Sequence, residues 1–312
     1  MKMKKTCTFF VALLFVLPLF SQINQADSTV QVIGYWALHD KQTYKFTEES
    51  NQIKNGTDTV KSNKITYLVD VEILDSTANL YTIQWLYHDL QVLKSAEPVM
   101  DEISKLSDNM KIIFTTNEMG QYEGLVNWME LRDRQNSALD TVAKRFSSIP
   151  NFDKYVEGMK KQFSTKESIE NSATKEIMLF YTFHGARYKL GEELNTEIKM
   201  PNMLGGEPFD GNLTVSLDTI DTTNDFYVLR CWQIADAGQL AAATVDFVNK
   251  MASTIAEKSV TLPKNEIPPV VNELRISSQI HGSTGWPLYV YQNSDVSVGN
   301  TLQLNDVSIE IQ

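Results

Sequence analysis

The four histidines are the side chains best suited to acid–base or metal chemistry in this 312-residue chain: His39, His88, His184 and His281. No two of them stand in an HExxH or HxH pattern, so a zinc site has little support. His39 and His184 occupy equivalent positions in two similar segments described below. Equivalent residues can converge on a shared ligand, but a turn or strand-end histidine present in both segments is the favoured interpretation.

The stretch QIHGSTGW (279–286) combines a histidine, a serine and two glycines, as hydrolase sites often do. Ser283 does not stand in a GxSxG pattern, and no strand-then-helix context surrounds it. The similar stretch NEMGQYEG (117–124) has neither serine nor histidine. Both stretches are therefore predicted to be hairpin turns.

Two short motifs match those of penicillin-binding serine enzymes. Residues 172–175 fit SxxK and residues 107–109 spell SDN. In those enzymes the SxxK serine comes first and a KTG element follows. Here the order is reversed and KTG is missing, which favours coincidence.

A calcium loop is the remaining metal candidate, because Asp218, Asp221, Asn224 and Asp225 lie close together in the chain. They lack the alternate-residue spacing and central glycine of such a loop, so only a weak surface site stays open. No phosphate-binding glycine loop is present. We predict no catalytic residue, no metal ligand and no cofactor, although sequence gives no distances between the many carboxylates that a hydrolase could use.

The N-terminal segment 1–21 has the pattern of a secretory signal peptide. Three lysines precede an apolar run from Phe9 to Phe20, which is shorter than the roughly 20 residues that span a bilayer, and Ser21 suits cleavage. Its removal changes the formal charge to (28 − 3) − 39 = −14. Such an acidic chain is a poor partner for nucleic acid or anionic lipid. We expect a periplasmic or extracellular protein without a transmembrane segment after cleavage.

One strand–turn–strand pattern occurs twice. ILDSTANLYTIQW (73–85) and TIDTTNDFYVLRCW (219–232) share their turn-forming residues at an offset of 146. Apolar residues alternate with polar ones on both sides of each turn, as a half-buried antiparallel hairpin requires. Cys231, the only cysteine outside the signal segment, continues one apolar face and is predicted to be buried. The five tryptophans are expected in the core or on sheet faces.

The similarity extends beyond the hairpins. Apolar stripes at helical spacing predict helices over 99–110 and 245–255, and each is followed by a strand and a glycine turn. Between the two segments, further stripes predict helices, the third of them opened by a capping box at Ser164 and Glu167. Alternation over 302–311 predicts a final strand.

The predicted fold is therefore α+β: two internally repeated antiparallel-sheet-plus-helix units joined by a helical connector. The boundaries are a signal peptide over 1–21, a first β-rich repeat over 22–131, a connector over 132–178 and a second β-rich repeat over 179–312.

The signal segment ending in LFSQ, followed by an acidic, strand-rich, cysteine-poor chain, resembles uncharacterised exported proteins of Bacteroidota-type Gram-negative bacteria. The resemblance implies export but brings no activity and no functional residues.

Three functions stay open. The first is non-catalytic binding of an apolar small molecule, or of a partner, in a cleft between the two repeats. The second is an envelope protein–protein interaction or assembly component that uses an exposed strand edge or a flat apolar patch. The third is a hydrolase, which a polar cleft with two converging carboxylates would favour.

Overall fold

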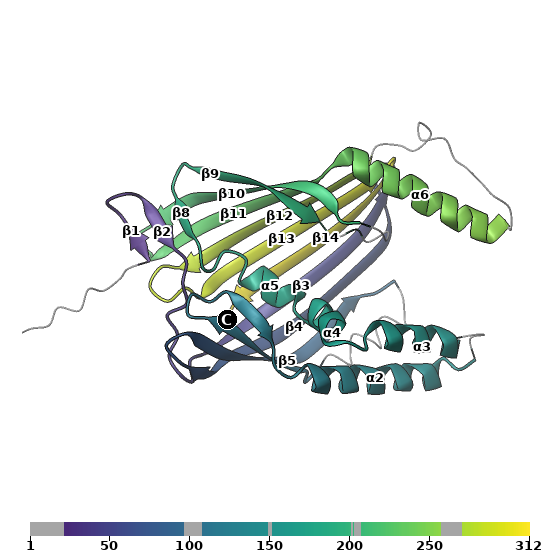
Figure 1. Ribbon diagram of the computed structural model, residues 1–312, viewed down its shortest axis with the longest axis horizontal. Helices are drawn as coiled ribbons and strands as arrows, with labels where there is room; N and C mark the ends of the chain where they lie inside the picture. The colour runs from purple at the N-terminus through teal and green to yellow at the C-terminus, as the bar shows by residue number, and fades with distance from the viewer. Residues whose placement is uncertain (1–21, 97–107, 149–151, 201, 203–206, 257–269) are drawn as a thin grey trace, which may run out of the picture.

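The computed structural model describes residues 22–96, 108–148, 152–200, 202, 207–256 and 270–312. Its main feature is one antiparallel sheet of eleven strands (Figure 1). From one edge to the other the strands are β7 (Tyr122–Leu125), β6 (Lys111–Asn117), β5 (Leu80–Lys94), β4 (Asp58–Ser76), β3 (Lys41–Lys54), β14 (Thr301–Ile311), β13 (Pro287–Val298), β12 (Val270–His281), β11 (Phe226–Ala235), β10 (Phe209–Asp221) and β9 (Glu193–Met200).

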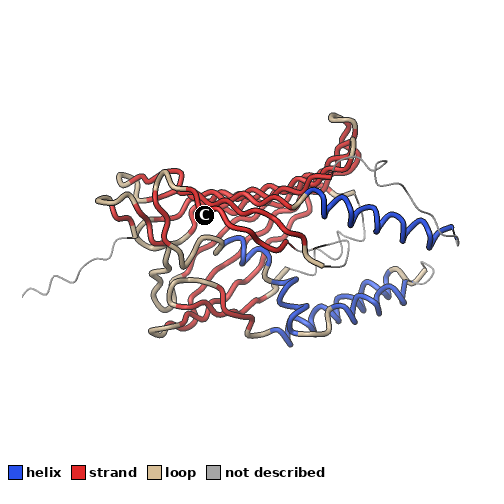
Figure 2. The backbone as a smooth tube through the Cα atoms, turned by 45° about the horizontal axis from the view of Figure 1, so that its top comes forward, coloured by secondary structure: helices blue, strands red, loops and turns tan. Residues whose placement is uncertain are grey.

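A small second sheet and five described helices complete the fold. The small sheet has the order β1 (Ile23–Asn24), β2 (Thr29–Gln31) and β8 (Arg187–Lys189). The helices are α2 (Trp128–Arg145), α3 (Phe152–Gln162), α4 (Lys166–Ala173), α5 (Lys175–Phe180) and α6 (Ala237–Ala256). In Figure 2, α6 and the pair α2 and α3 extend beyond the strands toward the same end of the molecule. α5 packs against β13, while α6 packs against β10 and β12.

The predicted arrangement of two separate sheet-plus-helix units is wrong, because the protein is mostly β and both halves contribute to one sheet. The halves join where β3 pairs with β14, from Tyr44 opposite Ile311 to Lys54 opposite Thr301. Alternation of apolar and polar residues predicts a strand, but it does not predict which strands pair with its two edges. The pairing of β3 with β14, which we call the seam, therefore cannot be predicted from the order of strands in the chain.

The predicted local elements fare better. Both repeated hairpins form, as β4 with β5 and as β10 with β11. The stretches 117–124 and 279–286 are hairpin turns, and 302–311 lies in β14. The helix predicted over 245–255 lies within α6, whereas most of 99–110 falls outside the described residues.

The signal segment 1–21 also falls outside the described residues. The capping box expected at Ser164 and Glu167 is wrong by one residue. Thr165 caps α4, and its side chain accepts a hydrogen bond from the backbone N–H of Ser168.

The main core lies between the sheet, α5 and the small sheet. It is aromatic at its centre: Trp85 is fully buried and packs edge-on against Phe46 and Phe180, with ring centroids 5.7 and 5.3 Å apart. Tyr44 makes a similar contact with Phe180 at 4.8 Å. Leu229 and others from the C-terminal half belong to the same cluster, so both halves share one core. A smaller cluster packs under α6.

The turn between β12 and β13 fits tightly against the segment that follows β2. Gly285 has a φ of +72°, and a Cβ at this position would lie 2.0 Å from the carbonyl oxygen of Ile33. Trp286 stacks on Trp36 beside this contact, with ring centroids 4.7 Å apart. Only glycine combines the left-handed backbone with so close an approach.

Candidate functional site

The two faces of the main sheet differ in charge. On the face packed against α5 and α6, register places these residues in one row across nine strands: Val92, Ile65, Glu48, Val307, Gln292, Ile276, Cys231, Val215 and Leu194. The next row on this face holds Asn63, Ser50, Asn305, Ser294, Leu274, Gln233, Leu213 and Thr196. We call these the inner rows. They contain one charged residue, Glu48.

The row between them points to the opposite face, because successive side chains of a strand alternate. It consists of Lys64, Glu49, Asp306, Asn293, Arg275, Trp232, Thr214 and Asn195. Four of these eight are charged. The contrast shows that the charge-poor character of the inner rows is a property of that face and not of these strands as a whole.

The inner rows are only partly covered. Ile276 and Cys231 are buried, but Val307, Leu274 and Leu213 are only half-buried. These half-buried apolar residues pack against the main core without being enclosed by it. This face therefore offers apolar and uncharged polar surface to a bound molecule.

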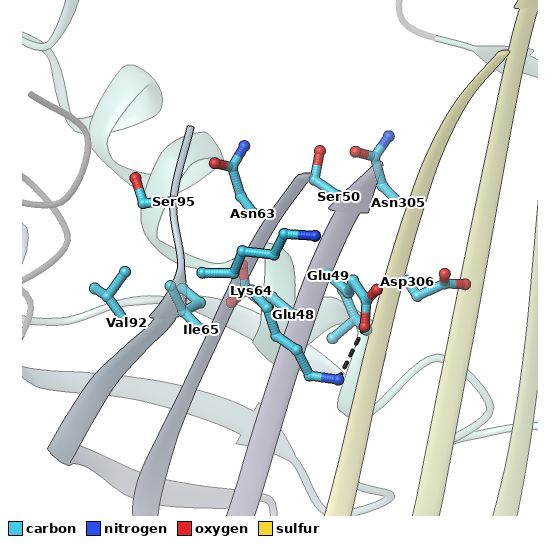
Figure 3. Close-up of a pocket in the computed structure, with 12 residues that line it drawn as sticks. Glu48, Glu49, Ser50, Asn63, Lys64, Ile65, Val92, Ser95, Asn305 and Asp306 are labelled. Carbon is cyan, nitrogen blue, oxygen red and sulfur yellow. Dashed lines mark hydrogen bonds and ion pairs between the residues drawn. The ribbon is translucent and has the colours of Figure 1, made fainter. Parts of the chain in front are cut away.

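A pocket of about 270 Å³ opens over one end of the inner rows (Figure 3). Its surface is mainly apolar. The inner rows and their neighbours on the four strands β14, β3, β4 and β5 line it with Glu48, Glu49, Ser50, Asn63, Lys64, Ile65, Val92, Lys94, Ser95, Asn305, Asp306 and Val307. Lys64 and Glu49 belong to the row on the opposite face, where Lys64 Nζ lies 2.9 Å from Glu49 Oε2.

Two carboxyl groups and two phenols meet beside this pocket. Tyr67 on β4 donates a hydrogen bond of 2.5 Å to Oε1 of Glu48 on β3. The Tyr67 and Tyr87 rings are neighbours, with centroids 5.6 Å apart. Glu176, in the first turn of α5, interacts electrostatically with Glu48 and with both tyrosines. We call Glu48, Tyr67, Tyr87 and Glu176 the carboxyl cluster.

The environment of the carboxyl cluster favours neutral side chains. Burial, and then repulsion from Glu48, raises the pKa of Glu176 to about 7. Burial also raises the pKa of Glu48, although the Tyr67 hydrogen bond and the Lys175 ammonium oppose that shift. The pKa values of both phenols lie well above 10 for the same reason. Near neutral pH the Glu176 carboxyl is therefore only partly ionised.

The histidines are not brought together. His39 is exposed and has a left-handed backbone with φ of 69°, so it is a turn residue. His184 is buried, and its Nε2–H donates a 2.9 Å hydrogen bond to the Gly285 carbonyl. His88 lies 3.5 Å from Asp70 and 3.0 Å from Asp89. The favoured interpretation, in which the first two do not share a ligand, agrees with these different surroundings.

The burial of His184 gives a prediction for acid stability. Burial lowers its pKa to about 4, from 6.5 in the unfolded chain, so the unfolded state binds a proton first. We expect stability to fall as the pH drops from 7 to 5, by roughly 2 kcal/mol from this group alone. Urea unfolding at the two pH values checks this. In His184→Gln that contribution disappears, and an unchanged pH slope in this variant would contradict the assignment.

The fourth histidine, His281, and Ser283 of the same turn lie beside Asp225 in the structure. Asp225 accepts a hydrogen bond of 2.5 Å from Ser283, and its Oδ2 lies 3.6 Å from His281 Nε2. The carboxylate thus stands between serine and histidine, whereas a nucleophile requires the base next to the serine. His281 Nδ1 instead contacts Thr284 at 2.9 Å. The grouping cross-links two turns.

The other candidate motifs also have local structural partners. Ser172 donates to the carbonyl of Ile169 within α4, Asp221 accepts from the turn backbone, and Asp218 pairs with Arg230 at 3.1 Å. Ser107 and the glycines at 205 and 206 fall outside the described residues. Within the ranges that the structure describes, no group of three or more His, Cys, Asp or Glu residues could hold a metal ion.

The predicted burial of Cys231 is confirmed, and burial raises the pKa of its thiol. Three tryptophans lie in the core, while Trp232 is exposed on the face of the sheet opposite the inner rows. Sequence reasoning missed the carboxyl cluster. Its signal was Glu48, which continues the alternation of Tyr44 and Phe46 and so puts a charge on an apolar face.

Comparisons with known proteins leave the family open. No protein-family model and no curated protein matches the chain. A structure titled "Lipid-protein interactions in lipovitellin" aligns over 87% of this chain and 25% of that one, with 8% identity and a TM-score of 0.38. This chain thus spans about a quarter of the lipovitellin chain.

An outer membrane channel from Pseudomonas putida F1 aligns over 90% of this chain and 98% of that one, with 9% identity and a TM-score of 0.17. Scores this low assign neither fold nor function. Among the described helices, none has the length and apolar character to cross a membrane.

Proposed function

We propose that this protein binds a molecule with an extended apolar chain along the inner rows, and that it does so in the periplasm or outside the cell. The observation that carries the proposal is the charge-poor, half-covered face of the sheet and the pocket that opens on it. Covering apolar side chains that are in contact with water stabilises the complex by about 25 cal/mol for each Å² of apolar surface buried.

The size of the pocket restricts the ligand. Sites for drug-sized molecules usually enclose about 300–1,000 Å³, and this pocket lies just below that range. A narrow chain that enters the pocket and continues along the inner rows fits better than a bulky ring system. An exported protein of this kind would meet apolar molecules that cross the water between membranes.

The two other functions have less support. Two carboxyls do meet beside the pocket, as a hydrolase would require, but the pocket is mainly apolar and Tyr67 already holds Glu48. Of the two edge strands, β9 is longer than β7, so an assembly role through a strand edge would use β9. That strand carries Glu193, Glu197 and Lys199, and charged side chains are a usual means of preventing edge pairing.

Binding of dodecanol, a neutral chain, tests the proposal. We expect saturable binding by equilibrium dialysis. Asn305→Lys should weaken it about tenfold, because it places a charge and added bulk in the pocket. The matched control is Asn293→Lys on β13, which faces the opposite side of the sheet and should bind dodecanol like the wild type. Absence of binding, or equal loss in both variants, would overturn the proposal.

A further inference from the structure

The carboxyl cluster lies where a chain in the pocket would end. Glu48 belongs both to the cluster and to the pocket lining. It is also the only charged residue of the inner rows, so it is where those rows can recognise a polar group by charge. A ligand that is apolar along its whole length would leave the carboxyl groups at this end of the site without a polar partner from the ligand.

Tyr87 gives an independent sign that the cluster lacks a partner. Tyr87 is 5% exposed, and its hydroxyl has no hydrogen-bond partner among the residues that the structure describes. Leaving such a group unsatisfied is costly, and most buried hydroxyls have a partner. The hydroxyl interacts electrostatically with Glu176 and Glu48, which places it in the same group as the two carboxyls.

The charges around the cluster favour a donor over an acceptor. The titratable groups that face it are Glu48 from β3, Tyr67 from β4, Tyr87 from β5, and Glu176 with the exposed Lys175 from α5. The two carboxyls interact with one cation, the solvent-exposed Lys175, while Lys94 of β5 lines the adjoining pocket and interacts with Glu49 instead. An ammonium group is small, donates three hydrogen bonds and carries the charge that two carboxyls need.

We propose that the ligand of the inner rows carries an amine at one end, and that Glu48 and Glu176 bind this amine while Tyr87 accepts one of its hydrogen bonds. This proposal rests on the proposed function and names the ligand class of the same site. The ammonium replaces the proton that Glu176 otherwise holds, and this proton is released to the solvent as the amine binds.

Three probes with the same chain and different ends test the inference by titration calorimetry at pH 7: dodecylammonium, dodecanol and dodecanoate. We expect dodecylammonium to bind at least tenfold more tightly than dodecanol, and dodecanoate to bind most weakly. Repeating the first titration in buffers of different ionisation enthalpy should reveal release of a proton.

Variants separate the cluster from the rest of the pocket. Glu176→Gln and Tyr87→Phe should each reduce the preference for the amine several-fold, and Glu48→Gln combined with Glu176→Gln should abolish it. Glu310→Gln, on the opposite face of β14, is the matched control and should keep the preference. If the double variant fails to fold, the two single variants still decide.

The outcomes distinguish the two proposals. Equal binding of dodecylammonium and dodecanol, tighter binding of dodecanoate, or an amine preference that survives in both single variants would overturn the amine inference and leave the proposed function standing. Failure of all three probes to bind would overturn both.

Discussion

Replacing Glu176 by glutamine is expected to stabilise the protein by about 3 kcal/mol at pH 8. The pKa of this carboxyl is about 7 in the folded state and 4.5 when unfolded. The folded state therefore holds a proton that the unfolded state has lost, and stability declines as the pH rises from 4.5 through 7. Glutamine resembles the protonated acid and removes this penalty.

The measurement is urea unfolding of both proteins at pH 5 and pH 8. The gain in Glu176→Gln should shrink to less than about 1 kcal/mol at pH 5, where the wild-type side chain is already largely protonated. Glu167→Gln, an exposed residue of α4, serves as control and should stay within about 0.5 kcal/mol of wild type at both pH values. A gain that is equal at both pH values would contradict the pKa assignment.

A site that loses stability when its acid ionises is a common sign of a binding or catalytic position. The ionised Glu176 carboxyl lowers the stability of the fold, so its role is more readily explained by binding than by stability. If Glu176→Gln gains stability and loses amine preference, one substitution will have separated the two roles of the residue.

The second large effect is expected at Gly285. An alanine Cβ would lie 2.0 Å from the Ile33 carbonyl oxygen, and the backbone would have to move or leave its left-handed conformation. The hydrogen bond from His184 to the Gly285 carbonyl would shift with it. We expect Gly285→Ala to lower the free energy of unfolding by roughly 3–5 kcal/mol.

A second glycine separates steric overlap from backbone strain in that experiment. Gly56 has a φ of +78°, but no atom of the described residues lies within 4 Å of a Cβ built there. Gly56→Ala should therefore cost only the conformational penalty, about 1–2 kcal/mol. Similar losses in the two variants would show that the contact with Ile33 is unimportant.

The sequence predicts local structure in this protein much better than it predicts assembly. Alternation and turn residues located both hairpins and the final strand, because each depends on neighbours in the chain. The apolar neighbours of Cys231 predicted its burial correctly. The pairing of β3 with β14 depends on which of many free strand edges meet, and no local pattern carries that information.

The carboxyl cluster escaped prediction for the same reason. Glu48 and Glu176 are far apart in the chain and come from a strand and a helix. Each is unremarkable among 39 acidic residues until α5 is placed against the sheet. Only Glu48 could have been singled out from the sequence, because it is an acid on an otherwise apolar strand face. Such exceptions to the alternation of a strand are worth testing for function.

The seam between β3 and β14 has a consequence for the order of folding. The ribosome makes β3 long before β14, so β3 must wait for its partner until the strands between them have been made. Contacts between distant parts of a chain form slowly because loop-closure entropy is lost before they are made. Until then β3 and β13 each present an unpaired edge. A polypeptide that cannot complete its sheet early stays unfolded for longer, which would suit the export that we propose.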